Sequence, residues 1–243
     1  MIHIRKTNNN NIPNYINIID FHLNCNVITY RNDILKGINT CLKKDKYSMI
    51  VLEYFDGTIF ELINANFSIF ARSAISDDKK QLFYSIFAQL LITIYLFHNK
   101  FNYYHNDAHL NNFLYKKVNN DNKYFHYKIG DKNYYIRNCG YLIVLSDYGL
   151  ATQIIRTDVN DYKMHALKDY EDILSKMLLY IKTIDTTKNI SNLREYINMS
   201  SLKNKTRFSS FDEFLFLDYM MNMLDTQIEK KENMILINEI PFE

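Results

Sequence analysis

The sequence predicts an α+β fold that is mainly helical and contains a few short strands. In the run from Lys79 to Lys100, apolar residues recur at spacings of three and four, as on the buried face of a long helix. The apolar stretches at 47–54, 113–115 and 141–145 are short, which is typical of buried strands. The chain is also 47% hydrophobic and 23% charged, a composition that allows a packed core.

The N-terminal part, residues 1–50, is expected to be irregular and poor in strands, because the asparagine run at 8–11 and Pro13 break regular structure. The stretch 47–54 closes this part as a buried strand. A turn at Asp56 and Gly57 then leads into a short helix that begins within 58–64.

The long helix is expected to be capped by Asp77 and Asp78. A polar loop at 104–112 follows it and leads into the strand 113–115. The segment 116–139 alternates around Gly130 and Asp131, which predicts a hairpin turn. After the strand 141–145, two or three more helices are expected, at about 169–183, 191–199 and 211–231.

Charge and cysteine content limit the classes of partner. The formal net charge of +2 is too close to zero to indicate nucleic acid or an acidic membrane, so neither is expected. Cys25, Cys41 and Cys139 are odd in number and widely spaced, which favours a reducing, cytoplasmic setting over a disulfide framework. The apolar run 90–97 is too short to span a bilayer.

The chemistry is predicted in two acidic segments that follow core elements. Residues 105–112 read His-Asn-Asp-Ala-His-Leu-Asn-Asn, and Asp147-Tyr148-Gly149 follows a strand. Phosphoryl transfer from ATP needs a carboxylate that orients the acceptor hydroxyl and oxygen ligands that hold Mg²⁺. Asp107 suits the first task, whereas Asn112 and Asp147 suit the second.

A metal-hydrolase site is the alternative reading of the same loop. His105, Asp107 and His109 alternate along the chain and could ligate a metal ion. That reading leaves Asn112 and Asp147 without a role.

These segments resemble the eukaryotic-type protein kinase superfamily. The His-x-Asp-x-x-x-x-Asn pattern is similar to its catalytic loop, and Asp147-Tyr148-Gly149 is similar to its DFG motif. Three further landmarks occur in the family's order, namely a hinge-like segment at 51–57, the end of helix E at 95–98 and the start of helix F at 172–175.

The resemblance implies a kinase-like fold with a reduced N-lobe. Residues 1–55 would be a remnant of the N-lobe and hinge, and 56–243 the C-lobe. The C-lobe would contain the catalytic loop at 105–112, an insertion hairpin at 116–140 and the DFG-like motif at 147–149. This insertion and the amino-acid sequence of the loop resemble serine/threonine kinases of large DNA viruses, poxvirus-like or giant-virus-like. Such kinases would act in the host cytoplasm.

The resemblance also assigns residues to ATP. Leu52 would be the gatekeeper, the backbone at Glu53 and Phe55 would meet adenine, and Leu114 would lie beneath the base.

In the catalytic loop, His105 would be structural, and Asp172 would brace the loop backbone from helix F. His109 stands where protein kinases usually place a lysine that touches the γ-phosphate, and a histidine there is similar to aminoglycoside and choline kinases. Asn106 replaces the usual arginine, so no cationic acceptor for a phosphorylated activation loop is evident.

Some family features are not evident. The chain has five glycines, none placed to form a Gly-x-Gly phosphate loop, and no Ala-Pro-Glu motif follows Gly149. The segment 11–15 resembles the one that follows helix C in the family, which would place the lysine that grips the phosphates upstream of Met1; Lys6 is the alternative within the chain. We therefore expect an N-terminally truncated kinase whose N-lobe could be supplied by a separate fragment or activator.

Three functions stay open. The first is a serine/threonine kinase that uses ATP and Mg²⁺ on a protein substrate. The second is a pseudokinase or truncated fragment acting as a binding module. The third is a small-molecule phosphotransferase of the aminoglycoside or choline kinase type.

Overall fold

The structure is a computed structural model that describes residues 14–15, 18–25, 47–67, 75–119, 121, 123–155, 159–184, 212–224 and parts of 226–242. The chain divides into two compact units. The smaller unit is Ile16–Tyr54, and the larger one contains the rest of the chain. Helices and small antiparallel sheets together confirm the α+β class.

The smaller unit is a β-hairpin. Strand β1 (Ile18–Cys25) pairs antiparallel with β2 (Tyr47–Leu52) and places Phe21 opposite Ile50. Strand β2 was predicted, but the strand-poor expectation for 1–50 is wrong at β1. Positions 19–25 alternate strictly between apolar and polar residues, which is the period-two pattern of a strand. Lys6 lies outside the described residues.

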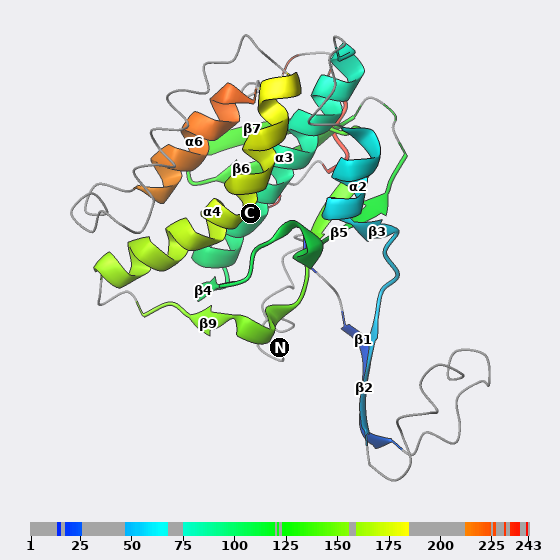
Figure 1. Ribbon diagram of the computed structural model, residues 1–243, viewed down its shortest axis with the longest axis vertical. Coiled ribbons are helices and arrows are strands. Elements are labelled where there is room, and N and C mark those ends of the chain that lie inside the picture. Colours follow the sequence, from blue (N-terminus) through cyan, green and yellow to red (C-terminus); the bar gives the residue numbers. More distant parts are fainter. Residues whose placement is uncertain are drawn as a thin grey trace. The chain divides into compact units, whose positions relative to one another are not determined.

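Helix α3 (Asp77–Asn99) forms the centre of the larger unit (Figure 1). Its N-cap is Ser76, whose hydroxyl accepts from the backbone N–H of Lys79, so the predicted caps Asp77 and Asp78 instead lie in the first turn. Both carboxylates still stabilise the helix there, because negative charge near a helix N-terminus interacts favourably with the helix dipole. Within the described residues, α3 alone is long and apolar enough to cross a membrane, and 83% of its most apolar window is buried inside the protein.

Two helices pack against α3, namely α4 (Val159–Ile184) and α6 (Glu213–Met223) (Figure 1). The first begins before the predicted residue 169, and the second ends before the predicted residue 231. The helix predicted at 191–199 lies outside the described residues. A fourth helix, α2 (Ile59–Asn66), begins with a capping box between Thr58 and Glu61.

A three-stranded antiparallel sheet carries the candidate loop. Its order is β3 (Gly57–Thr58), β5 (Phe113–Lys117) and β8 (Tyr141–Leu145), with Phe113 opposite Leu145. Strand β4 (Tyr103–Tyr104) pairs antiparallel with β9 (Thr152–Gln153). The pair connects the start of the candidate loop 105–112 with the chain that follows 147–149.

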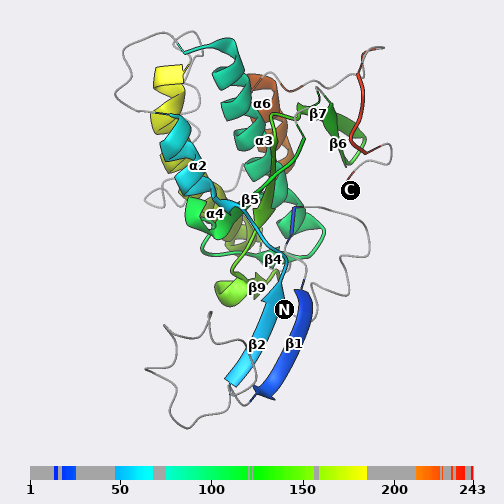
Figure 2. The ribbon, with the colours of Figure 1, turned by 90° about the vertical axis from the view of Figure 1, so that its right-hand side faces the viewer.

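The predicted hairpin of the 116–139 segment is confirmed. Strand β6 (Tyr124–Ile129) pairs with β7 (Lys132–Arg137) around Gly130, whose φ of 58° favours glycine. C-terminal residues extend this hairpin, since Leu236 bridges to Tyr124 and Phe242 to Tyr127 (Figure 2).

Residues 14 and 15 are anchored in the core of the larger unit. Tyr15 is fully buried, forms a parallel bridge with Leu145 and donates its hydroxyl to the Thr93 carbonyl at 2.8 Å. Asn14 donates to the Ile143 carbonyl at 2.7 Å. The chain before the hairpin is therefore tied to both α3 and β8.

Candidate active site

The candidate loop leaves β4 and returns through the 3-10 turn η3 (Leu110–Asn112) to β5. Two backbone hydrogen bonds of 2.9 Å fold it, from His109 N–H to the Asp107 carbonyl and from Asn112 N–H to the His109 carbonyl. Because of these turns, residues five positions apart come into contact.

Asp107 and Asn112 lie in direct contact within the loop. The Asn112 side-chain Nδ2 donates to the Asp107 carbonyl at 2.8 Å and to its carboxylate Oδ2 at 2.9 Å. Asn112 is buried, whereas the Asp107 side chain is 37% exposed. The amide therefore fixes a carboxylate that still reaches solvent.

His109 lies on the exposed side of that carboxylate. Its Nε2 is 3.5 Å from Asp107 Oδ2, and its side chain is 45% exposed. Its Nδ1 is buried and has no hydrogen-bond partner within the described part of the chain. The ring thus stands beside the group predicted to orient the acceptor hydroxyl.

His105 has the structural role predicted for it. It is fully buried and packs against Phe97 and Tyr148, with ring centroids 5.8 and 6.0 Å away. Its Nε2 lies 2.8 Å from the Ser146 carbonyl, so that nitrogen must carry the proton. The ring therefore ties the loop to the residue that precedes Asp147.

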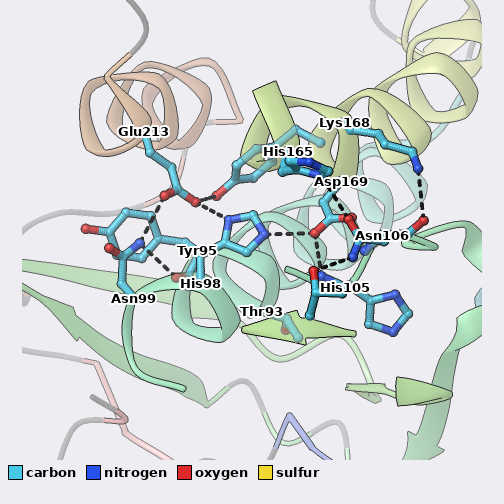
Figure 3. Close-up of polar contacts among 12 residues, drawn as sticks. Thr93, Tyr95, His98, Asn99, His105, Asn106, His165, Lys168, Asp169 and Glu213 are labelled. Carbon is cyan, nitrogen blue, oxygen red and sulfur yellow. Dashed lines mark hydrogen bonds and ion pairs between the residues drawn. The ribbon is translucent and has the colours of Figure 1, made fainter. Parts of the chain in front are cut away.

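The brace of the loop backbone comes from Asp169, and the assignment of that role to Asp172 is wrong (Figure 3). Asp169 is fully buried on α4 and accepts from the backbone N–H groups of His105 and Asn106, each at 2.7 Å. Asp172 lies about one helical turn further on, with a partly exposed side chain.

Asp169 is itself held by a buried histidine. His98 Nε2 lies 2.9 Å from Asp169 Oδ2, and His98 Nδ1 lies 2.7 Å from Glu213 Oε1 (Figure 3). Both ring nitrogens face carboxylates and must donate, which requires the imidazolium form. Burial alone would lower the pKa of His98, but the charges of Glu213 and Asp169 and the hydrogen bonds to them raise it to about 9.

Glu213 completes this buried ion network from α6. Its Oε1 also accepts from the Tyr170 hydroxyl at 2.8 Å, and its Oε2 from Asn99 Nδ2 at 3.1 Å. Sequence reasoning missed this carboxylate because nothing near Glu213 in the chain marks it as a partner of a residue on α3. His98 belongs to the segment 95–98, which resembles the end of helix E, but no role was predicted for it.

Asn106 joins the loop to the segment that follows Asp147. Its Nδ2 donates to the Leu150 carbonyl at 3.0 Å and to the Thr152 hydroxyl at 2.8 Å. Its Oδ1 accepts from His165 Nδ1 at 3.1 Å, and its carbonyl accepts from Lys168 Nζ at 3.3 Å (Figure 3). Asn106 is thus the centre of a polar clamp between the candidate loop, the segment 150–152 and α4.

Asp147 follows β8 directly and has left-handed backbone angles, with φ 56° and ψ 69°. Its exposed carboxylate accepts from the Gly149 N–H at 3.3 Å and begins the 3-10 turn η4 (Tyr148–Leu150). In the described residues, three non-glycine residues have positive φ, and all belong to this region, namely Asn102, Asn106 and Asp147. Such backbone strain often occurs at functional sites.

Asn112 and Asp147 are linked through Ser146. Both the N–H and the hydroxyl of Ser146 donate to the Asn112 carbonyl, at 2.8 and 2.7 Å. Since the Asn112 Nδ2 is turned to Asp107, its Oδ1 is the side-chain atom left to bind a cation. An amide oxygen and an exposed carboxylate are ligand types that Mg²⁺ prefers, and its binding by Asn112 and Asp147 stays a prediction.

The four residues assigned to adenine fall in two units. Leu52 ends β2, and Glu53 follows it in the smaller unit. Phe55 and Leu114 belong to the larger unit and are half-buried. Their contact with a nucleotide stays a prediction.

The metal-hydrolase alternative finds no support in this geometry. His105 is engaged with a backbone carbonyl and is not aimed at Asp107 or His109. Across the described residues, no group of three or more His, Cys, Asp or Glu side chains is placed to hold a metal ion.

The chain matches no protein-family model and no curated protein. The functional assignment therefore depends on the residues and their geometry.

Proposed function

We propose that this protein is a protein-kinase-like phosphotransferase that moves the γ-phosphate of ATP to a serine or threonine hydroxyl of a protein. The single observation that carries the proposal is the pair of 2.7 Å hydrogen bonds from the backbone N–H groups of His105 and Asn106 to the buried Asp169 carboxylate. The kinase resemblance implies such a brace, and a residue outside the motif provides it.

Each polar residue of the candidate loop and of the segment at Asp147 has its own role in the proposed reaction. Asp107 accepts a hydrogen bond from the acceptor hydroxyl and orients its oxygen, because the Asn112 amide fixes the carboxylate while leaving it open to solvent. Asn112 and Asp147 would hold Mg²⁺, which when bound neutralises charge on the phosphates. His109, beside Asp107, would donate to a phosphate oxygen.

A second candidate is a small-molecule phosphotransferase. The observation that favours it is His109, because a histidine at this loop position is similar to aminoglycoside and choline kinases. Its Nε2 lies 3.5 Å from the Asp107 carboxylate, so it would share the acceptor site.

The proposal is tested by following labelled γ-phosphate from Mg-ATP onto serine- and threonine-containing peptides, with an aminoglycoside and choline as parallel acceptors. Asp107→Asn should reduce transfer at least about a hundredfold, the lower range for a positioned acid or base. Asp131→Asn is the matched control, because Asp131 lies in the exposed hairpin turn.

Label on peptides that disappears in Asp107→Asn alone supports the protein kinase. Label on aminoglycoside or choline alone supports the second candidate. Equal transfer by wild type and Asp107→Asn contradicts both, and no transfer by the folded wild type favours a pseudokinase.

A further inference from the structure

Glu213 is a buried carboxylate to which the proposed reaction assigns no role. It begins α6, and its side chain is 4% exposed. Burying a carboxylate is costly unless positive charge and hydrogen bonds compensate for the lost water. Its position at a helix N-terminus helps, because negative charge is favourable there. Its contacts with other helices indicate what it does.

Side chains from α3 and α4 hold both oxygens of this carboxylate. Its Oε1 lies 2.7 Å from His98 Nδ1 and accepts from the Tyr170 hydroxyl at 2.8 Å. Its Oε2 accepts from Asn99 Nδ2 at 3.1 Å (Figure 3). Glu213 thus joins α6 to α3 and α4 and lies directly against a buried imidazole.

A chain of hydrogen bonds continues from His98 to the candidate loop. His98 Nε2 lies 2.9 Å from Asp169 Oδ2. The Asp169 carboxylate accepts from the backbone N–H groups of His105 and Asn106, each at 2.7 Å, and Asp107 is the next residue. Two buried side chains therefore connect Glu213 to the backbone beside the candidate catalytic carboxylate.

The charge of His98 determines whether this chain is complete. An imidazolium donates from both ring nitrogens, whereas a neutral imidazole has one N–H and would turn a bare nitrogen toward one of the carboxylates. Glu213 on α6 and Asp169 on α4 favour the charged form, against the burial that disfavours it. The Tyr170 hydroxyl donates to the same Glu213 oxygen, and the Tyr104 ring lies 5.7 Å from the His98 ring.

We infer that Glu213 is a positioning residue of the candidate loop. It keeps His98 in the charged form that donates to Asp169, and Asp169 in turn fixes the loop backbone. The inference rests on the proposed function only for the catalytic use of the loop, since the hydrogen bonds are a property of the fold.

Two NMR measurements test this role in Glu213→Gln, which keeps the shape of the side chain and removes its charge. Titration of the histidine rings should show the pKa of His98 falling from about 9 to below about 8. Hydrogen exchange of the His105 and Asn106 N–H groups should become about tenfold faster or more. The N–H of Leu90, in the buried part of α3, should change less, whereas a general loss of stability would accelerate all of them alike.

Asp218→Asn is the matched control. It makes the same change on the same helix, at a carboxylate that accepts from Lys132 Nζ and the Tyr134 hydroxyl. It should leave the pKa of His98 unchanged and loop exchange within about twofold of wild type. Glu213→Asp keeps the charge, so the pKa of His98 should stay higher in it than in Glu213→Gln.

An unchanged pKa of His98 in Glu213→Gln would overturn the inference. Loop exchange that is accelerated no more than that of Leu90, or equally in Asp218→Asn, would do the same. If Glu213→Gln does not fold, wild type decides the question. Protection of the His105 and Asn106 N–H groups should fall as the pH rises through about 9, and constant protection from about pH 8 to 10 would overturn the inference.

Phosphate transfer separates this inference from the proposed function. Where wild type transfers phosphate, Glu213→Gln should lower kcat about tenfold and leave KM for Mg-ATP within about twofold. Unchanged kcat would contradict a catalytic use of this positioning. A wild type that transfers no phosphate would contradict the proposed function alone, because the exchange measurement tests Glu213 independently.

Discussion

The backbone N–H of His105 donates a 2.7 Å hydrogen bond to the carboxylate of Asp169, 64 residues further along the chain. The same carboxylate accepts from Asn106 and contacts the His98 imidazolium. The candidate loop is thus attached to two helices through one buried side chain, and its geometry depends on their packing.

The first prediction concerns this attachment. Asp169→Asn should lower the free energy of unfolding by about 3 kcal/mol or more, because it removes the partner of a buried imidazolium and places amide hydrogens near backbone donors. Asp172→Asn, the same change one turn away, should stay within about 0.5 kcal/mol of wild type. Urea unfolding measures both, and equal losses in the two variants would contradict the assignment of the brace to Asp169.

The second prediction is a pH dependence of stability. His98 has a pKa of about 9 in the folded protein against an ordinary value of 6.5 for histidine, so the folded state binds the proton more tightly. The stabilisation, about 3 kcal/mol from the difference in pKa, is present in full below about pH 6.5 and is lost as the pH rises through about 9. His98→Gln should flatten this decline in unfolding free energy between pH 7 and 10. A variant that declines as steeply as wild type would show that other groups cause it.

The sequence predicted the local parts of this site better than its supports. The hairpin at Gly130 follows from a short pattern, and the structure confirms it. Asp107 and Asn112 come from one short motif, and the structure places them in contact, whereas their roles stay predictions. The brace was predicted at Asp172, one helical turn beyond Asp169, because both carboxylates lie on one continuous helix and spacing alone does not distinguish them. Glu213 was missed, since its contact with His98 spans 115 positions and depends on how α6 packs on α3.

The third prediction concerns the clamp at Asn106. Asn106→Ala removes the side-chain bonds to Leu150, Thr152 and His165 and also places alanine at a φ of 63°. Asn106→Gly removes the same bonds but tolerates that backbone conformation. The alanine variant should therefore be less stable than the glycine variant by about 1 kcal/mol.

Both Asn106 variants should speed hydrogen exchange of the Ile154 N–H, which donates to the Asn102 carbonyl next to the clamped segment. Unchanged exchange in both variants would show that the side chain does not hold the segment after Asp147.

The fourth prediction separates the two aspartates of the candidate site. Asp107→Asn should keep nucleotide affinity within a few-fold of wild type, because Asp107 is assigned to the acceptor hydroxyl. Asp147→Asn should remove the Mg²⁺ dependence of that affinity, because it replaces a charged oxygen ligand. Titration of a fluorescent ATP analogue with and without Mg²⁺ measures both, and a reversed pattern would exchange the two roles.

The most direct test of the central claim is the thermal unfolding midpoint with and without Mg-ATP, for wild type and Asp147→Asn. Ligand at about 100 times its Kd stabilises the folded state by about 2.7 kcal/mol, which raises the midpoint by several degrees. We predict this rise for wild type with Mg-ATP, and none for Asp147→Asn or for wild type with ATP and a chelator. No shift for wild type at millimolar Mg-ATP, or the same shift in Asp147→Asn, would contradict a nucleotide site built on Asn112 and Asp147.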